Sequence, residues 1–101
     1  MKIYLAGPYT KGDVGQNVHN AIKTADKLVE KGHTPYIPHL THFWHLVSPK
    51  PWEFWCNLDA EFLVLCDALL RIPGESTGAD REVKLAQKHG LPVYYNVNDI
   101  P

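Results

Sequence analysis

Two acidic residues, Asp59 and Glu82, fall where the sequence predicts inward-facing sides of two helices. Around Glu82, a helical period of about 100° per residue places Val83, Leu85 and Ala86 on one face, and Glu82 lies between Leu85 and Ala86. A single glutamate in a first helical turn usually stabilises the helix dipole or caps the N-terminus. A second inward carboxylate nearby makes a chemical role the better interpretation.

Asp59 is that second carboxylate. It lies three or four residues from apolar positions of a helix predicted over residues 52–65. Charged side chains are rarely buried unless they are paired or functional, because desolvation costs several kcal/mol. Two inward carboxylates on neighbouring helices therefore suggest an acid/base pair or a nucleophile with its acid. The apolar side around Asp59 consists of Trp52, Trp55, Cys56, Phe62 and Leu63.

Short β-rich runs that alternate with amphipathic stretches position both carboxylates. Strands are predicted over residues 2–6, 33–37, 66–72 and 92–95, and helices over residues 17–31, 52–65 and 79–89. Ser76 and Thr77 are suited to cap the last helix, and Gly90 to end it. The alternation predicts one α/β domain over residues 1–101, with a parallel sheet of about four strands in the order 2-1-3-4 and helices on both faces.

In sheets of this kind, ligands bind beyond the carboxyl ends of the strands. The loops expected at that edge are residues 7–16, 38–51 and 73–78, and both carboxylates lie close to it. The turn before the last helix also forms a natural site for phosphate or carboxylate groups, because helix N-termini attract anions. The sequence therefore predicts one cleft.

The composition limits the kinds of binding partner to be expected. The net charge of −1 gives no reason to expect a nucleic-acid polymer or an anionic membrane surface as partner. No apolar run approaches the roughly 20 residues of a membrane span, and the N-terminus lacks a signal-peptide pattern. Cys56 and Cys66 lie in apolar contexts and are predicted to be buried thiols without a disulfide, as expected of a cytoplasmic protein.

The segment from Pro38 to Pro51 contains three histidines at every third position, His39, His42 and His45. Their spacing invites a metal site, but neither H-E-x-x-H nor a Cys/His pattern is present, so no metal is expected and the rings are predicted to line a substrate loop or face solvent. Phe43 and Trp44 are candidates for a stacking platform for a planar base. Hydrophobic cover or a subunit interface explains them equally well. 

Three blocks of the sequence carry a resemblance to a known family. They are the opening residues 1–10 (MKIYLAGPYT), the stretch from Trp52-Glu53 through Asp59 to Ala68, and the S-x-G-x-x-x-E pattern at residues 76–82. Together and in this order, they resemble the nucleoside 2-deoxyribosyltransferase-like superfamily, most closely its small, mostly uncharacterised DUF4406-type members. The resemblance covers almost the whole chain and is in keeping with a flavodoxin- or Rossmann-like parallel sheet.

The resemblance implies an enzyme that needs no metal and no cofactor. Members cleave or exchange the N-glycosidic bond of a (deoxy)nucleoside or its 5′-monophosphate through a glutamyl glycosyl-enzyme intermediate, as retaining glycosidases do. Glu82 matches the nucleophile, and Asp59 matches the acid/base residue. The substrate-binding residues expected are Gly7, Pro8, Tyr9, Lys11, Ser76, Thr77, Gly78, Trp44 and Trp55.

The chain departs from nucleotide-specific relatives, which carry serine and arginine in the first loop where this sequence has Pro8, Tyr9 and Lys11. Arg81 is a further candidate for phosphate, but its helical angle predicts that it points outward. Specificity for a 5′-phosphate therefore stays open. Relatives also complete their sites from a neighbouring subunit, so a homodimer or higher homo-oligomer is expected, with residues 96–101 as one contributor.

Two other classes of function remain open from the sequence. The chain is also compatible with a nucleotide-binding or sensing module without turnover, and with a structural, partner-binding domain of the same fold. An enzyme requires the two carboxyl groups to share one pocket, within about 8 Å. It also requires an ionised Glu82, held by donors near Ser76–Gly78, and an Asp59 with a raised pKa.

Overall fold

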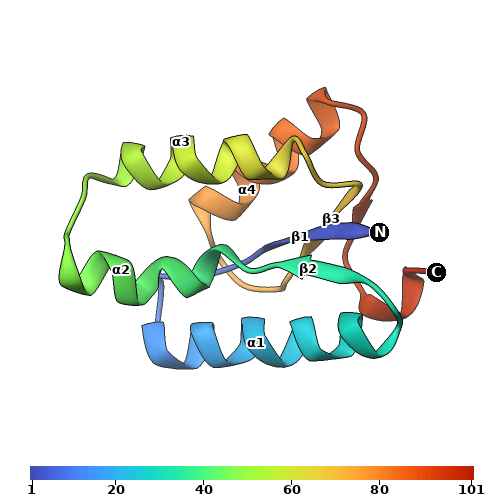
Figure 1. Cartoon of the computed structure of the whole chain (residues 1–101), viewed down its shortest axis with the longest axis horizontal. Coiled ribbons are helices and arrows are strands. Elements are labelled where there is room, and N and C mark those ends of the chain that lie inside the picture. The colour runs from blue at the N-terminus through green and yellow to red at the C-terminus, as the bar shows by residue number, and fades with distance from the viewer.

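The computed structural model describes residues 1–101 and contains a four-stranded, all-parallel sheet between two helical layers (Figure 1). The strand order β2-β1-β3-β4 and the parallel pairing confirm the predicted fold. The strands are β1 (Lys2–Ala6), β2 (Thr34–Tyr36), β3 (Ala68–Arg71) and β4 (Val93–Tyr94).

Helix α1 (Val14–Glu30) covers one face of the sheet, while α3 (Trp52–Leu63) and α4 (Thr77–Lys88) cover the other (Figure 1). Between β2 and α3 the chain forms a 3-10 turn, η1 (Pro38–Thr41), and a short helix, α2 (His42–Val47). A second 3-10 turn, η2 (Val97–Asp99), follows β4. No helix is both long enough and apolar enough to cross a membrane.

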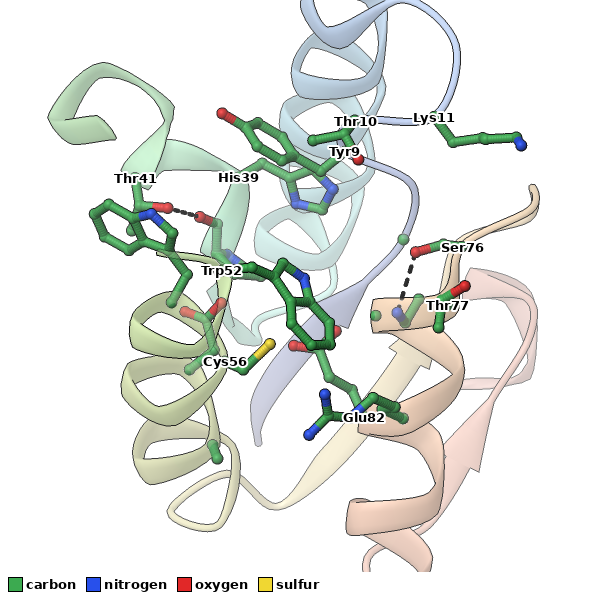
Figure 2. Close-up of a pocket in the computed structure, with 18 of the residues that line it drawn as sticks. Tyr9, Thr10, Lys11, His39, Thr41, Trp52, Cys56, Ser76, Thr77 and Glu82 are labelled. Atoms are coloured by element: carbon green, nitrogen blue, oxygen red, sulfur yellow. Dashed lines mark hydrogen bonds between the residues drawn. The ribbon is translucent and has the colours of Figure 1, made fainter. Parts of the chain in front are cut away.

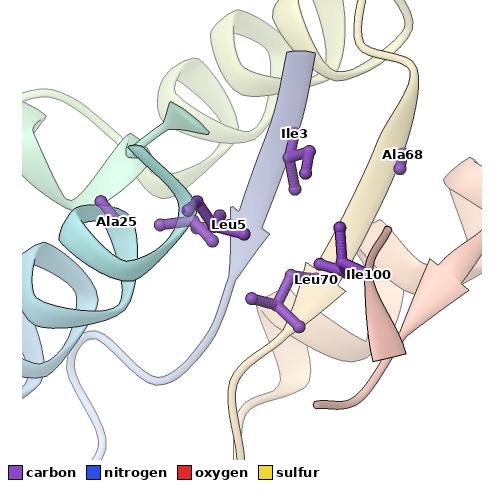
Figure 3. Packing of buried hydrophobic residues seen from close by; sticks show 7 residues of the cluster. Ile3, Leu5, Ala25, Ala68, Leu70 and Ile100 are labelled. Carbon is purple, nitrogen blue, oxygen red and sulfur yellow. The ribbon is translucent and has the colours of Figure 1, made fainter. Parts of the chain in front are cut away.

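Alternation along the two central strands divides the core into two clusters. Ile3, Leu5 and Leu70 face α1, where they pack with Leu28 and with Ile100 from the end of the chain (Figure 3). On the other face, the fully buried members are Tyr4, Ala6, Leu63, Leu69 and Ala86, with Ala79 and Cys66 beside them. Tyr4 is the buried polar side chain that β1 contributes to this second cluster.

The register brings the ends of β1 and β3 together, because Ala6 pairs with Arg71. The loops that follow these two strands are in close contact. A Cβ on Gly7 would lie 2.8 Å from Cβ of Ile72, and one on Gly74 would lie 2.6 Å from the Pro8 ring. Gly74 also has a φ of 124°, which favours glycine. This edge of the sheet therefore requires glycine at both positions.

Several element boundaries differ from those predicted. Helix α1 begins at Val14, one turn earlier than residue 17, because the Asp13 carboxylate accepts a hydrogen bond from the Gln16 N–H at 3.1 Å and caps the helix. Helix α4 begins at Thr77, two residues earlier than predicted, and Ser76 caps it as its sequence predicts. Strand β1 has the predicted bounds, whereas β2, β3 and β4 are each two or three residues shorter than expected.

The prediction of a loop over residues 38–51 is wrong for its first part. Pro38 occupies the first position of η1, where its missing N–H costs no hydrogen bond, and the helical backbone continues through α2 to Val47. The Ser48 N–H donates to the Trp44 carbonyl at 2.8 Å and closes the last turn. Residues 38–47 are therefore helical rather than an extended loop.

Candidate active site

A cavity of about 570 Å³ opens at the carboxyl edge of the sheet (Figure 2). Its walls come from the loop after β1, from η1 and α2, from α3, and from the first turns of α4. Asp59 and Glu82 both line it, one from α3 and one from α4. The two carboxyl groups therefore share one open pocket, as an enzymatic function requires, and their separation within about 8 Å stays a prediction.

Glu82 projects from the second turn of α4 toward β1, where the Tyr4 hydroxyl donates a hydrogen bond to its carboxylate. Burial raises the pKa of Glu82 to about 7, the Tyr4 hydrogen bond opposes this, and the Asp59 charge adds to it. Burial and the neighbouring Glu82 carboxylate also raise the pKa of Tyr4, so its hydroxyl keeps the proton that it donates.

The prediction that donors near Ser76–Gly78 hold Glu82 ionised is therefore wrong on both counts. The donor is Tyr4, from the neighbouring strand, and the pKa of Glu82 is raised instead of lowered. The physical reason is that β1, α3 and α4 exclude water from this carboxyl more effectively than one hydrogen bond compensates. Near neutral pH, Glu82 is divided between its ionised and protonated forms.

Asp59 behaves as its sequence context predicts. Burial raises its pKa to about 7, and one carboxyl oxygen, Oδ1, is buried without a hydrogen-bond partner. A carboxylate in this setting retains a proton more readily than an exposed one. Asp59 is thus suited to donate a proton near neutral pH.

The first turn of α4 forms the opposite wall. The Ser76 hydroxyl accepts a hydrogen bond from the Ala79 N–H at 3.1 Å, which leaves its own proton available to a ligand (Figure 2). The N–H groups of Thr77 and Gly78 have no acceptor within the helix because they belong to its first turn. A Cβ on Gly78 would meet no atom within 4 Å, so this backbone faces open cavity.

Arg81 does not point away from the site, contrary to the prediction from its helical angle. Its guanidinium lies 4.8 Å from the centre of the Trp52 ring, and both residues line the cavity. The long side chain reaches across from α4 to α3, which a projection of Cα positions cannot show. Arg81 opposes the raised pKa of Glu82 and adds positive charge beside the carboxyl pair.

The three histidines have separate partners and do not converge. His39 is buried and its Nε2 donates to the Pro8 carbonyl at 2.9 Å, while burial lowers its pKa. His42 Nδ1 lies 2.5 Å from the Tyr9 hydroxyl. His45 Nδ1 accepts a hydrogen bond from the Trp55 indole N–H at 2.9 Å. His39 and His45 line the cavity.

Most of the predicted binding residues line the cavity, and two do not. Trp44 is absent from the cavity wall, and its ring lies perpendicular to that of Trp55, with 5.0 Å between the ring centres. Pro8 packs against the position of Gly74 and contributes only its carbonyl, to His39. The predicted residues present in the cavity wall are Gly7, Tyr9, Lys11, Trp55, Ser76, Thr77 and Gly78.

Other wall residues were not predicted as binding residues. Trp52, Thr41 and Asn57 line the cavity, together with Cys56, which is half-buried instead of buried as expected. Helical spacing contains a signal for some of them, because Trp52 and Cys56 lie on the same side of α3 as Asp59. Thr41 carried no such signal while its segment was assigned to a loop, whereas His45 was one of the histidines predicted to line a substrate loop or face solvent.

The C-terminal residues contribute nothing to this cavity. Ile100 is buried in the core beneath α1, and the Lys31 ammonium donates to the carbonyls of Val97 and Ile100. Asn96 caps η2 by accepting a hydrogen bond from the Asn98 N–H at 2.9 Å. A role for this tail in the site of a neighbouring subunit remains a prediction.

The fold is that of an α/β protein with a four-stranded parallel sheet, and a solved deoxyribosyltransferase structure shares it. The structure is similar to that of a 2-deoxyribosyltransferase from the psychrotolerant bacterium Bacillus psychrosaccharolyticus, with a TM-score of 0.70 and 24% sequence identity. The alignment covers 92% of this chain and 69% of that one. At this level of identity, the similarity establishes the fold alone.

The sequence belongs to the family described as Domain of unknown function (DUF7768), whose model matches residues 1–96. The closer placement among DUF4406-type members is not confirmed by this match. No curated protein matches the chain.

Proposed function

We propose that this protein cleaves or exchanges the N-glycosidic bond of a (deoxy)nucleoside or its 5′-monophosphate, with Glu82 as nucleophile and Asp59 as general acid and base. The observation that carries the proposal is the shared cavity, in which two carboxyl groups from different helices each have a pKa raised to about 7. The deoxyribosyltransferase fold supports the same chemistry. A site for simple anion binding would not place two carboxyl groups together.

In the first step, the ionised Glu82 carboxylate attacks the anomeric carbon of the sugar, and the bond from that carbon to the base nitrogen breaks. Asp59 transfers its proton to the departing base, which leaves neutral. The products are the free base, an ester between the sugar and Glu82, and an ionised Asp59. Tyr4 holds the carboxylate of Glu82 in place through its hydrogen bond.

In the second step, Asp59 acts as a base and takes a proton from water or from a second base that attacks the anomeric carbon. The ester bond breaks and Glu82 returns to its carboxylate form. Productive turnover requires one proton on the pair, placed on Asp59. Because the two groups interact, their apparent pKa values belong to the pair, and we expect a bell-shaped pH profile centred near neutral pH.

We expect the parts of the substrate to lie along separate walls of the cavity. The sugar and its 5′ substituent are expected beside Glu82 and the first turn of α4, with the Ser76 hydroxyl and Lys11 as donors. Because Asp59 lies on α3, the leaving base is expected against that helix and the aromatic rings of Trp52 and Trp55. A small-molecule nucleoside or nucleotide fits these surfaces.

Incubation of the protein with a panel of ribo- and deoxyribonucleosides and their 5′-monophosphates, followed by chromatography, tests the proposal. Release of free base from at least one member is expected, and an added second base distinguishes exchange from hydrolysis. Absence of base release from every member at neutral pH would contradict the proposed activity. Comparison of each nucleoside with its 5′-monophosphate settles the role of a phosphate.

A further inference from the structure

Thr41 and His45 form a pair on one wall of the cavity. They lie four residues apart in continuous helical backbone, where η1 runs into α2, so their side chains emerge on the same face. Both line the cavity. His45 also stacks edge-on against Trp55, at 5.7 Å between ring centres, which joins this wall to α3.

The hydrogen bonds of His45 fix which of its nitrogens carries the proton. Nδ1 accepts from the Trp55 indole N–H at 2.9 Å and from the Lys50 backbone N–H at 3.3 Å. An imidazole nitrogen that accepts hydrogen bonds holds no proton, so the proton of the neutral ring is on Nε2. Nε2 has no partner within the chain and is not buried, so it is an available donor.

Thr41 offers a ligand an acceptor, whereas His45 offers a donor. Its hydroxyl donates to the Pro38 carbonyl at 2.8 Å, a bond that is visible in Figure 2. The single proton of the hydroxyl is committed to that bond, and only the lone pairs of its oxygen remain for a ligand. The wall therefore presents a donor at His45 and an acceptor at Thr41, next to each other.

The position of this pair relative to Asp59 indicates which part of a substrate it meets. Trp55, which holds His45, precedes Asp59 by one helical turn on the same side of α3. Asp59 is the residue that protonates the leaving base in the proposed reaction. The proposed reaction puts the base beside Asp59, and Trp55 links that side of α3 to the wall to which Thr41 and His45 belong.

We infer that Thr41 and His45 select bases with a carbonyl next to a ring N–H, the edge shared by uracil, thymine, hypoxanthine and guanine. The carbonyl oxygen accepts from His45 Nε2–H, and the ring N–H donates to Thr41 Oγ. In cytosine and adenine, an amino group stands beside an unprotonated ring nitrogen, so both polarities are reversed. The amino group would then meet His45 Nε2–H as donor against donor, and the ring nitrogen would meet Thr41 Oγ as acceptor against acceptor. The inference rests on the proposed function and specifies its substrate class.

The test compares matched pairs of substrates, deoxyuridine with deoxycytidine and deoxyinosine with deoxyadenosine. We expect kcat/KM for base release to favour the first member of each pair by about 10-fold or more, since mismatched donors leave buried polar groups unpaired. Affinities measured by calorimetry on the Glu82→Gln protein, which binds without turnover, are expected to show the same preference.

Two pairs of variants test whether His45 and Thr41 cause the base preference. In His45→Asn, the amide oxygen replaces Nδ1 as the acceptor for Trp55 but nothing reaches the position of Nε2, so the preference should fall to about 1- to 3-fold. His45→Gln restores a donor at that reach and should recover part of it. Thr41→Val should also reduce the preference, whereas Thr41→Ser keeps the hydroxyl and should retain it.

The outcomes separate this inference from the proposed function. If nucleosides bind or react but the amino bases are equal or preferred, the inference is overturned and the proposed function stands. A preference that survives in both His45→Asn and Thr41→Val also overturns it, because other residues then read the base. If no nucleoside binds or reacts, the proposed function fails and the inference fails with it.

Discussion

The carboxyl groups of Asp59 and Glu82 make the stability of this protein depend on pH. Both have a higher pKa in the folded chain than an exposed carboxyl has. Between roughly pH 4 and pH 7 the folded state therefore binds more protons than the unfolded state, so the free energy of unfolding falls as pH rises through that window. The fold tolerates this cost because the same burial tunes the two groups for catalysis.

Glu82→Gln should remove the contribution of Glu82 to this pH dependence of the free energy of unfolding. We expect the variant to exceed the wild type in free energy of unfolding by about 1–3 kcal/mol at pH 8, where the glutamate must ionise, and to match it near pH 4. Urea denaturation at both pH values measures the difference. Glu53→Gln, an exposed position on α3, is the control and should show no such dependence. An equal effect of Glu82→Gln at both pH values would contradict the account.

Gly78 offers a test at a single backbone position. The methyl group in Gly78→Ala meets no protein atom, and alanine favours a helix over glycine by roughly 0.5–1 kcal/mol, so thermal stability should be unchanged or slightly higher. The methyl group nevertheless enters the cavity beside the unpaired N–H groups of α4, so nucleoside affinity should fall at least about 5-fold. Gly15→Ala, in the first turn of α1, leaves the cavity untouched and should retain affinity.

At the scale of elements, Arg71 connects the end of β3 to α4. It is buried, and its guanidinium donates to the carbonyls of Ile72 and Gly74 and to the Asp80 carboxylate, the last two at 2.9 and 3.0 Å. These bonds fix the turn that leads to Ser76 and to the first turn of α4. The cavity wall that α4 forms thus depends on a residue outside the cavity.

Arg71→Met should leave the two loop carbonyls without their donor and lower the free energy of unfolding by about 2–3 kcal/mol. Because the turn positions α4, KM for the best nucleoside should rise by a larger factor than kcat falls. Asp80→Asn keeps a neutral acceptor at an exposed site and should change either quantity little. A stable Arg71→Met protein with wild-type KM would show that the turn holds its shape without this residue.

The sequence predicted the elements with strong periodicity and missed those whose form depends on packing. β1 and the apolar stripe of α3 follow from local patterns, as does the inward position of Asp59 and Glu82. The short helix α2 lacks caps and a clear apolar face, so its residues were assigned to a loop and Trp44 to the wrong surface. The pKa of Glu82 depends on Tyr4, 78 positions away in the chain, and on the helix opposite, which no local pattern encodes.

At the scale of the molecule, α2, α3 and the residues just beyond α3 expose a large amount of apolar surface. Phe43, Val47 and Leu65 have 68, 86 and 69% of their surface exposed. Helix α3 buries only Leu63. Exposed apolar side chains that gather into one patch are typical of interfaces. We propose that this surface mediates a homodimer or higher homo-oligomer.

Sedimentation at micromolar concentration is expected to show an oligomer for the wild type. Val47→Asp, at the end of α2, should shift the protein toward a monomer, because a charge at a buried interface position costs several kcal/mol. Val29→Asp provides the control, since Val29 is 57% exposed on α1, away from this surface. A wild-type protein that sediments as a monomer would refute the proposal.

The central claim, that Glu82 is the nucleophile and Asp59 its acid, is tested most directly by the rate of base release. With the best nucleoside of the panel, Glu82→Ala should remove essentially all turnover, and Asp59→Asn should slow it by about 10²–10⁴-fold. Glu61→Ala, an exposed position on α3 outside the cavity, should retain wild-type turnover. Near-normal base release by Glu82→Ala would contradict the assignment.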